Sequence, residues 1–216
     1  MTIATANITC HGALLTLTNQ RAVYWPEQRA LILSDLHIGK TAHFRKSGIP
    51  VPSNILEQDL ERLKTLILHF KPVTLLIVGD LFHAEFNKDI SVFHLWMRQF
   101  KQLNLVLIKG NHDKHVFELY EGLTIDIISN YLEIAPFIFT HHISKVKDDA
   151  FYISGHTHPG VLLKGKGRQK IKLPCFQVSQ QQLILPAFSL FTGLNTNNAP
   201  ATCVNYAFTD TQLFKL

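Results

Sequence analysis

The sequence predicts an α/β (α+β) fold, with a βαβαβ half followed by a mostly antiparallel, β-rich half. Three observations predict it. Short apolar runs recur that are nearly continuous rather than alternating, as in strands that are covered on both faces. Amphipathic helical segments separate the early runs, which favours parallel strands with helices outside them. After residue 158 the chain changes to short β-like segments bounded by turn residues, which is typical of antiparallel pairs.

Five of the apolar runs end abruptly in residues that can bind a metal ion. In chain order they are RALILSD leading to Asp35 and His37, VTLLIVGD ending at Asp80, LNLVLIKG before Asn111-His112-Asp113, APFIFT before His141-His142, and AFYISG before His156 and His158. Ligands of open α/β sheets bind beyond the carboxyl ends of the strands. We therefore expect these polar side chains to surround one crevice.

Two helices are expected between the early strands. The first begins after Pro52, where Asn54 and Glu57 form a capping-box-like pair. It ends before Pro72, and its apolar stripe at helical spacing consists of Leu56, Leu60, Leu63, Ile67 and Phe70. The second covers residues 88–100, and its apolar members are Phe93, Leu95, Trp96 and Phe100.

The part of the chain after residue 158 contains four β-like segments, at residues 161–164, 168–178, 183–185 and 203–209. Turn residues separate them, so most of their pairings are expected to be antiparallel. No linker, repeat or low-complexity block divides the sequence. We therefore expect one domain over residues 1–216.

Composition excludes several classes of protein. The net charge is +5 and the sequence pI is about 9.1, which suits an anionic partner. Three widely separated cysteines form no CxxC pair, which argues against a disulfide framework. The sequence has no secretory signal pattern and no run approaching about 18 apolar residues. We therefore expect a cytoplasmic protein without membrane association.

Histidine is the unusual residue of this chain, with 12 copies. Imidazole is the commonest metal ligand in proteins. Residues two apart point the same way on extended backbone, which pairs Asp35 with His37 and His156 with His158. The oxygen and nitrogen donors at the strand ends are Asp35, His37, Asp80, Asn111, His141, His156 and His158.

Seven donors are too many for one first-row ion, but they suit two ions that share a carboxylate. Because no cysteine is among them, the set favours divalent Mn²⁺, with Fe²⁺, Zn²⁺ or Mg²⁺ as alternatives, over copper(I). Adjacent residues on extended backbone point oppositely, so only one of His141 and His142 can bind. We expect His141, the first residue after its strand, with His142 facing the cleft or solvent.

The motif series DLH…GDLFH…GNHD…THH…GHTH resembles the calcineurin-like metallophosphoesterases, and it spans Asp35 to His158. The segments LHIGKTAHFRKSGIPVP, GHTHP, LPCF and ILPAFSLFTG are similar to those of the bacterial ligase-associated DNA-damage-response endonucleases. The resemblance implies a four-layer αββα sandwich, in which two mixed β-sheets are flanked by helices. One departure is His141-His142, where many relatives have His-Gly.

The resemblance also implies roles for the motif residues. One divalent ion would be held by Asp35, His37 and His158, and the other by Asn111, His141 and His156. Asp80 would bridge them, and a hydroxide between the ions would attack the phosphodiester in line. His112 resembles the family's catalytic histidine, which protonates the leaving oxygen. Asp113 is expected to orient His112, while His83 either lines the cleft or supports a turn.

Two features are candidates for substrate binding. Arg45 could hold a phosphate through two hydrogen bonds, or it could form a surface ion pair. Basic residues at every second position could form one face along a strand for a nucleic-acid backbone; they are Lys164, Lys166, Arg168, Lys170 and Lys172. Gly165 and Gly167 instead suggest a solvated hairpin within this run.

The predicted function is a binuclear metal-dependent phosphodiesterase, and by the resemblance a DNA endonuclease in DNA repair, with single-stranded DNA as the expected partner. A DNA ligase and a helicase of the same pathway are partners implied by the resemblance alone. A homodimer through an exposed apolar strand late in the chain is also open. The alternatives are an enzyme acting on small nucleotides or phosphoproteins, and a non-catalytic binding module.

Overall fold

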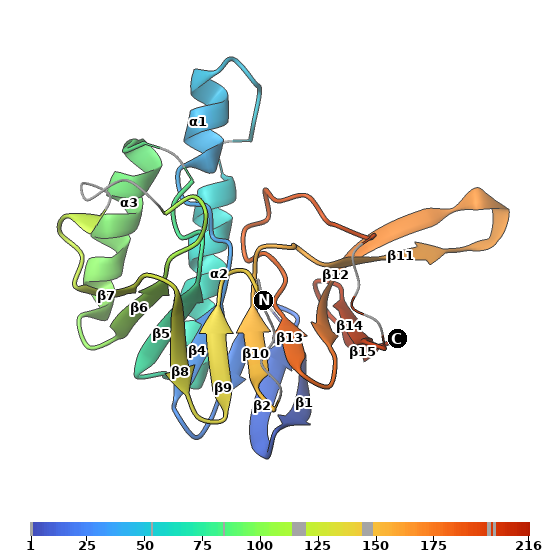
Figure 1. Ribbon diagram of the computed structural model, residues 1–216. Helices are drawn as coiled ribbons and strands as arrows, with labels where there is room; N and C mark the ends of the chain where they lie inside the picture. Colours follow the sequence, from blue (N-terminus) through green and yellow to red (C-terminus); the bar gives the residue numbers. More distant parts are fainter. Residues whose placement is uncertain are drawn as a thin grey trace.

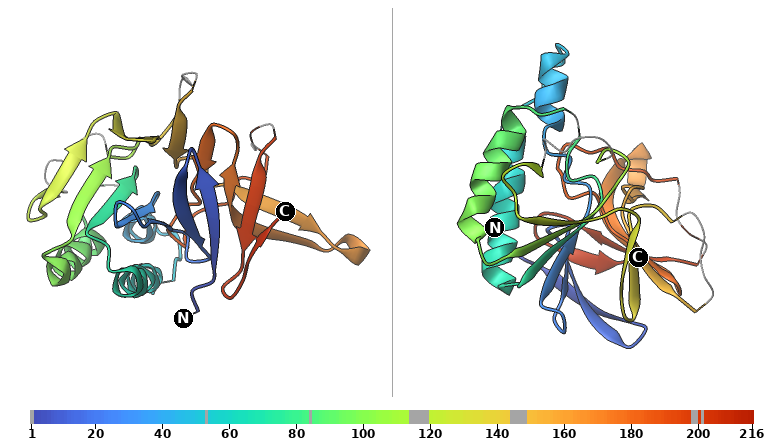
Figure 2. Two further views of the ribbon diagram at one scale, coloured as in Figure 1. Left: turned by 90° about the horizontal axis from the view of Figure 1, so that it is seen from below. Right: turned by 60° about the vertical axis from the view of Figure 1, so that its left-hand side comes forward.

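The computed structural model describes residues 2–52, 54–83, 85–113, 120–143, 149–197, 200 and 202–216. Their strands form two mixed β-sheets that pack face to face, and two of the three α-helices lie against the first sheet (Figures 1 and 2). The predicted α/β sandwich with two mixed sheets is confirmed. None of the described helices is long and apolar enough to cross a membrane.

The first sheet combines an antiparallel meander with a parallel half. Its strands are β1 (Thr5–Cys10), β2 (Ala13–Thr18), β3 (Val23–Trp25), β4 (Ala30–Leu33), β5 (Thr74–Val78), β6 (Asn104–Ile108) and β7 (Ile125–Ile128), in that spatial order. Strands β1 to β4 pair antiparallel, and β4 to β7 pair parallel. The parallel half confirms the predicted βαβαβ unit, whereas the sequence pattern defined no bounds for β1, β2 and β3.

Three α-helices accompany this sheet: α1 (Lys40–Lys46), α2 (Ile55–Phe70) and α3 (Lys88–Met97), the last continued by a 3₁₀ turn over Arg98–Phe100. The apolar stripe of α2 and three residues of α3 pack with β4, β5 and β6 in one core. Asn54 is the N-cap residue of α2, but its side chain makes no capping hydrogen bond, so the predicted capping box is wrong. Leu95 is 65% exposed rather than packed.

The second sheet contains β8 (Tyr131–Ile134), β9 (Phe137–Thr140), β10 (Phe151–Ser154), β12 (Lys170–Val178), β13 (Gln182–Ile184), β14 (Val204–Phe208) and β15 (Leu213–Lys215). Their spatial order is β15-β14-β12-β13-β10-β9-β8. The pairings are antiparallel except that β10 lies parallel to both β9 and β13. The antiparallel prediction therefore holds for most of this half.

A core of large aromatic side chains joins the two sheets. Trp25 of the first sheet packs edge-on against Phe137 of the second, with ring centroids 4.9 Å apart, and both are buried. Phe139, Phe151 and Phe176 extend the same cluster. Replacing one such ring by alanine typically costs about 3–5 kcal/mol, so this layer fixes the two sheets relative to each other.

Strand β11 (Gly160–Lys164) leaves the second sheet and pairs only with the first part of β12 (Figure 1). The two strands form a hairpin that projects from the body, with a 3₁₀ turn over Lys166–Arg168 at its tip. Gly167 adopts φ 65° within this turn. The hairpin suggested by the glycines is thus present, and the five basic residues do not lie on one continuous strand.

Candidate metal centre

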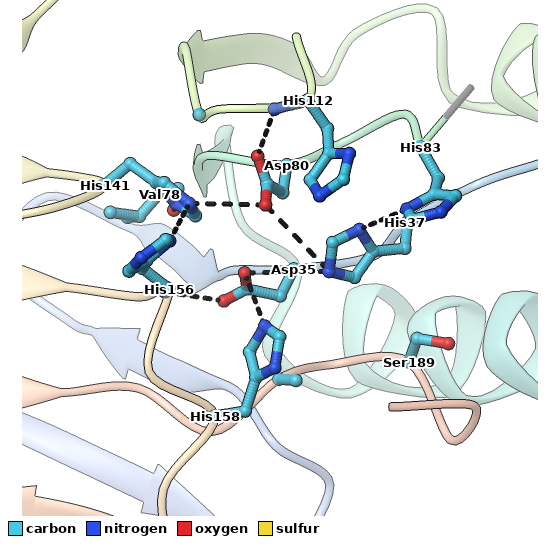
Figure 3. Close-up of polar contacts among 12 residues, drawn as sticks. Asp35, His37, Val78, Asp80, His83, His112, His141, His156, His158 and Ser189 are labelled. Carbon is cyan, nitrogen blue, oxygen red and sulfur yellow. Dashed lines mark hydrogen bonds and ion pairs between the residues drawn. The ribbon is translucent and has the colours of Figure 1, made fainter. Parts of the chain in front are cut away.

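Six of the seven predicted metal ligands, all except Asn111, converge where the carboxyl ends of strands from both sheets meet (Figure 3). Asp35 follows β4 and Asp80 follows β5 in the first sheet, while His141 follows β9 and His156 follows β10 in the second. Three groups of described side chains place their donor atoms within 4.8 Å of one another. The first group is Asp35, His37 and His158, and the second is Asp80, His141 and His156; a further group at the edge is His37, His83 and His112.

The first group surrounds the carboxylate of Asp35, which is fully buried. Its Oδ1 lies 3.0 Å from Nε2 of His158 and 3.9 Å from Nε2 of His37. Its Oδ2 accepts a hydrogen bond of 3.1 Å from the backbone N–H of His156. Asp35 therefore links the first group to His156 of the second.

The second group surrounds Asp80 and His141. Oδ2 of Asp80 lies 3.3 Å from Nε2 of His141, and that nitrogen lies 3.2 Å from Nδ1 of His156. Nδ1 of His141 lies 2.9 Å from the carbonyl oxygen of Val78, so an N–H there would donate to it and leave Nε2 facing the centre. His141 is buried while His142 is exposed, as expected from their order after β9.

The backbone conformation of the ligand residues differs from the predicted one. The expectation that extended backbone pairs Asp35 with His37 and His156 with His158 is wrong. These four residues and Asp80 have left-handed backbone, with φ of 56° at Asp35, 49° at His37, 53° at Asp80, 69° at His156 and 50° at His158. The loops are held instead by their neighbours: the N–H of Asp35 donates to Gly79 and that of His37 donates to the carbonyl of Asp80.

Three glycines allow these loops to pass beside the ligand side chains. A Cβ on Gly79 would clash with the ring of His141, and one on Gly110 would clash with the carboxylate of Asp80. A Cβ on Gly155 would lie 2.7 Å from Oδ2 of Asp35. Each glycine thus leaves room for a ligand that comes from a different loop.

Charge is distributed unevenly over the centre. Burial alone would lower the pKa of His141, but the hydrogen bond to Asp80 and the charges of Asp35 and Asp80 raise it to about 9. Burial would raise the pKa of Asp80, yet its contacts with His141 and the backbone N–H of His112 hold it well below its usual range. Burial lowers the pKa of His37 to about 3, so this imidazole is neutral near pH 7.

These donors fit two divalent cations. Nε2 of His37 is buried and has no hydrogen-bond partner among the described residues, although it lies 3.9 Å from Asp35 and 4.0 Å from Oδ2 of Asp80. A cation between a neutral imidazole and two carboxylates would satisfy all three. Asp80 faces both His37 and His141, so its carboxylate lies between the two groups.

Asn111 and His112 follow β6 at the edge of this centre. Asn111 lines a cavity together with His141, which places this residue on the side of the second group. The backbone N–H of His112 donates to Oδ1 of Asp80 at 3.0 Å. Its ring stacks on His83 with centroids 4.5 Å apart, and Nδ1 of His83 lies 3.4 Å from Nδ1 of His37. Thus His83 lies beside the centre rather than only in a turn.

The side chain of Asp113 contacts the backbone of two loops. Its carboxylate accepts hydrogen bonds from the backbone N–H groups of Asp80, Gly110 and Phe82, at 2.7, 2.9 and 3.2 Å. It is 1% exposed, and burial raises its pKa. Asp113 therefore fastens the loops after β5 and β6 together, and these contacts hold the backbone rather than the imidazole of His112.

The substrate-binding candidates lie away from the two groups. Arg45 forms an ion pair with Asp89, at 3.5 Å, which is the alternative that the sequence left open. The predicted basic stripe is split between the strands and the tip of the projecting hairpin, where all five side chains are exposed. Lys164 lies directly opposite Lys170, and Lys172 lies on the same face two residues further along.

A strap over residues 187–190 supports the centre and was not predicted. The backbone N–H of Ser189 donates to the carbonyl of Asp35. Arg21 donates to the carbonyls of Ala187 and Ser189, and Arg62 donates to Phe188 and to Asp59. Arg62 and Asp59 are both buried on α2. The sequence singled out the segment ILPAFSLFTG, which contains this strap, only through the family resemblance, and Asp59 and Arg62, three apart on the buried side of a helix, were a second signal.

This chain is similar to known proteins in both sequence and structure. Residues 28–148 match the family model described as calcineurin-like phosphoesterase, a range that contains Asp35, Asp80 and Asn111 and ends before His156. No curated protein matches the sequence significantly. The crystal structure of Pseudomonas putida nuclease MPE superposes with a TM-score of 0.83 and 29% identity, covering 98% of this chain and 100% of that one. Yfce, a phosphoesterase from E. coli, gives a TM-score of 0.48 and 15% identity, covering 87% of this chain and 97% of that one.

Proposed function

The chain belongs to the calcineurin-like phosphoesterase family, and on that premise we propose that it is a metal-dependent endonuclease that hydrolyses phosphodiester bonds of single-stranded DNA. Membership of the family makes it a metal-dependent phosphoesterase. The nature of the phosphoester is the part that we propose. A role in DNA repair, with a ligase and a helicase as partners, is a further expectation that rests on the resemblance alone.

The observation that carries the proposal is the convergence of three residues from each sheet on one centre, in which the carboxylate of Asp80 lies between the two ligand groups. Asp35, His37 and Asp80 come from the first sheet, and the histidines that face them come from the second. This donor set would hold two divalent ions, for which Mn²⁺ remains our expectation over Fe²⁺, Zn²⁺ and Mg²⁺. Bound ions of this kind polarise phosphoryl oxygens and lower the pKa of water to about 7.

The protein's own side chains have distinct tasks in this reaction. Asp80 fixes His112 through the backbone hydrogen bond, and His83 holds the ring of His112 by stacking. His112 itself is exposed, so it can reach a substrate oxygen, and we assign it the proton transfer to the leaving oxygen. Asp113 keeps the loops of Asp80 and His112 in register through three backbone hydrogen bonds.

Three observations support DNA as the substrate. The net charge of +5 favours a polyanion, and the projecting hairpin carries five exposed basic residues. In addition, the structure that superposes at 29% identity is described as a nuclease. An open single strand is expected because its phosphates can enter a centre recessed between two sheets.

The proposal is tested by incubating the manganese-loaded protein with circular single-stranded DNA, with cyclic nucleotides and with a phosphopeptide. Cleavage of the circle with little turnover of the other two substrates is the expected result, because a circle has no ends and only an endonuclease opens it. Turnover of cyclic nucleotides or of the phosphopeptide alone would instead identify the alternative enzyme.

Asp80→Asn tests the two-ion centre. We expect kcat/KM to fall by at least about 100-fold, because the amide removes the charge that both ligand groups share. The matched control is Asp126→Asn, which makes the same change on an exposed carboxylate of β7 and should leave turnover unaltered. Wild-type turnover in both variants would exclude the two-ion centre. Absence of hydrolysis in the wild-type protein would instead support the binding-module alternative, which keeps the fold without the chemistry.

A further inference from the structure

A cavity of about 530 Å³ opens directly beside the second ligand group. Its inner wall is formed by Asn111 and His141, both of them predicted metal ligands. Its outer wall is formed by the turn that joins β7 of the first sheet to β8 of the second, where Ser129, Asn130 and Tyr131 lie. A substrate group next to the reacting phosphate would therefore have space in this direction.

The aromatic ring of Tyr131 is the main feature of this outer wall. Tyr131 is 53% exposed, the most exposed aromatic side chain among the described residues. It begins β8 and pairs directly with Thr140, the residue before His141. Backbone pairing thus places Tyr131 opposite the residue that precedes a predicted metal ligand.

The remaining groups around the cavity are polar or basic. Lys109 and His142 line it, together with Ser129 and Asn130, and none of the lining residues is acidic. The hydroxyl of Thr140 bonds the carbonyls of Asn130 and His142, at 3.2 Å each, which ties the turn to the end of β9. A flat ring with polar edges, attached to an anionic phosphate, matches this combination of an aromatic face, hydrogen-bonding side chains and positive charge.

An exposed tyrosine on an edge strand is often present only because aromatic residues favour strands. Two facts weigh against that reading here. The ring borders a cavity rather than open surface, and the same cavity contains two predicted metal ligands. A phosphoserine or a simple alkyl phosphate would leave this wall unused, whereas each nucleotide of a DNA strand carries a base one sugar away from its phosphate.

We propose that this cavity is a nucleobase subsite, in which the base of a nucleotide adjoining the scissile phosphodiester stacks on Tyr131. The inference rests on the proposed phosphodiesterase function and adds that the substrate is recognised as a nucleotide. Stacking on an aromatic face tolerates every base, so the subsite confers nucleotide selectivity without sequence selectivity.

The experiment uses dTpdT, which has a single phosphodiester, and two analogues in which one thymidine or the other is replaced by an abasic deoxyribose. Tyr131→Ala should raise KM for dTpdT about tenfold, and removal of the stacked base should raise it by a similar factor for the wild type. The two changes combined should give no further rise, since they delete the same contact. Tyr131→Phe and Tyr131→Trp retain a ring and should restore a low KM.

Leu68→Ala truncates an exposed apolar side chain on α2, away from the cavity, and controls for the loss of surface hydrophobicity. An unchanged KM for Tyr131→Ala, or effects of the variant and of the abasic sugar that simply multiply, would overturn the subsite. The melting temperature of each variant shows whether it has folded.

A binding measurement separates failure of this inference from failure of the proposed function. An oligonucleotide containing 2-aminopurine is titrated with the metal-free protein, and stacking on Tyr131 should quench the fluorescence of the base. Quenching that disappears in Tyr131→Ala supports the subsite even if no phosphodiester is hydrolysed. Hydrolysis of dTpdT without any quenching or KM effect would support the proposed function and reject the subsite.

Discussion

At the scale of single residues, the contact between Asp80 and His141 determines how the centre responds to pH. The pKa of His141 is raised to about 9, so in the metal-free protein its ring is charged at neutral pH. Because this folded-state pKa exceeds the ordinary value of 6.5, the contact stabilises the metal-free fold fully below pH 6.5, and its contribution is lost as the pH rises through about 9.

A metal ion that binds Nε2 of His141 must displace this proton. We therefore expect about one proton to be released from His141 on manganese binding at about pH 7.5, and metal affinity to rise with pH until about pH 9. Calorimetry in buffers of different ionisation enthalpy measures the release. It should be absent in His141→Ala and unchanged in His69→Ala, an exposed histidine near the end of α2. Binding without proton release would show that His141 is not a ligand.

Gly79 offers a steric test of the same histidine. In Gly79→Ala the new Cβ would meet the His141 ring, and at φ 85° the backbone would be strained as well. We expect metal affinity to fall more than about tenfold and the free energy of unfolding to fall by about 1–2 kcal/mol.

Gly122→Ala provides the matched control, because Gly122 has φ 82° and nothing within 4 Å of the position of a Cβ. It should show a similar loss of stability, measured by chemical denaturation, with unchanged metal affinity. If both glycine variants lost metal affinity equally, backbone strain rather than the contact with His141 would be the cause.

The residues of the candidate centre were predictable because each stands at the end of an apolar run, and the ends of such runs share one edge of a sheet. Their backbone conformation was not, because left-handed φ at Asp35 or His158 arises from loops held by other loops. The contacts of Asp113 could not be predicted either, because they also join different loops. A carboxylate that binds three backbone N–H groups from two loops leaves no pattern along the chain.

At the scale of elements, the hairpin of β11 and β12 is the part best suited to reach a long substrate. Lys164, Lys170 and Lys172 share one face, and Lys166 and Arg168 lie at the tip. The other face is apolar and includes Leu163 opposite Ile171. The hairpin begins two residues after His158, so its basic face could contact DNA that enters the centre.

Replacing the five basic hairpin residues by Gln should weaken DNA cleavage while hydrolysis of a small aryl phosphodiester persists. The salt dependence of DNA binding should fall by about one unit of slope for each phosphate contact that is lost. A matched variant changes five other exposed basic residues to Gln: Arg29, Lys71, Lys88, Lys101 and Lys215. If the hairpin variant lost both activities equally, the stripe would be structural.

Helix α3 shows how well the pattern of apolar residues predicts which positions of a helix are buried. Its core residues Ile90, Phe93 and Met97 recur at helical spacing and are buried. Leu95 lies two residues after Phe93, which rotates it by about 200° around the axis, toward solvent. Apolar identity alone was therefore insufficient, and the phase of the helix was needed to separate packed from exposed positions.

At the scale of the whole molecule, the ligand groups join two sheets that are otherwise held by an aromatic core and the strap. The buried strands of both sheets, such as β4 and β10, were predictable because a short, continuous apolar run is typical of a strand that is covered on both faces. The meander of β1 to β3 and the parallel pairing of β10 with β13 were not, since they depend on contacts distant in sequence. Homodimer formation stays a prediction.

Metal binding should stabilise this assembly measurably. With manganese at about 100 times its dissociation constant, the free energy of unfolding rises by about 2.7 kcal/mol, which corresponds to an increase of about 5–10 °C in Tm for a chain of this size. Differential scanning calorimetry with manganese and with EDTA measures the shift. Asp80→Asn should lose most of it, and an equal shift in that variant would place the ions elsewhere.

The left-handed backbone at five predicted ligands also has a consequence for evolution. Each such residue costs about 1–2 kcal/mol relative to the right-handed form, and glycine would avoid this penalty. In a descendant that no longer needed the metals, substitution at these positions would relieve strain and increase thermodynamic stability. Selection for chemistry must therefore continually oppose mutations that the fold alone would favour, and an inactive homologue is expected to show its first changes at these sites.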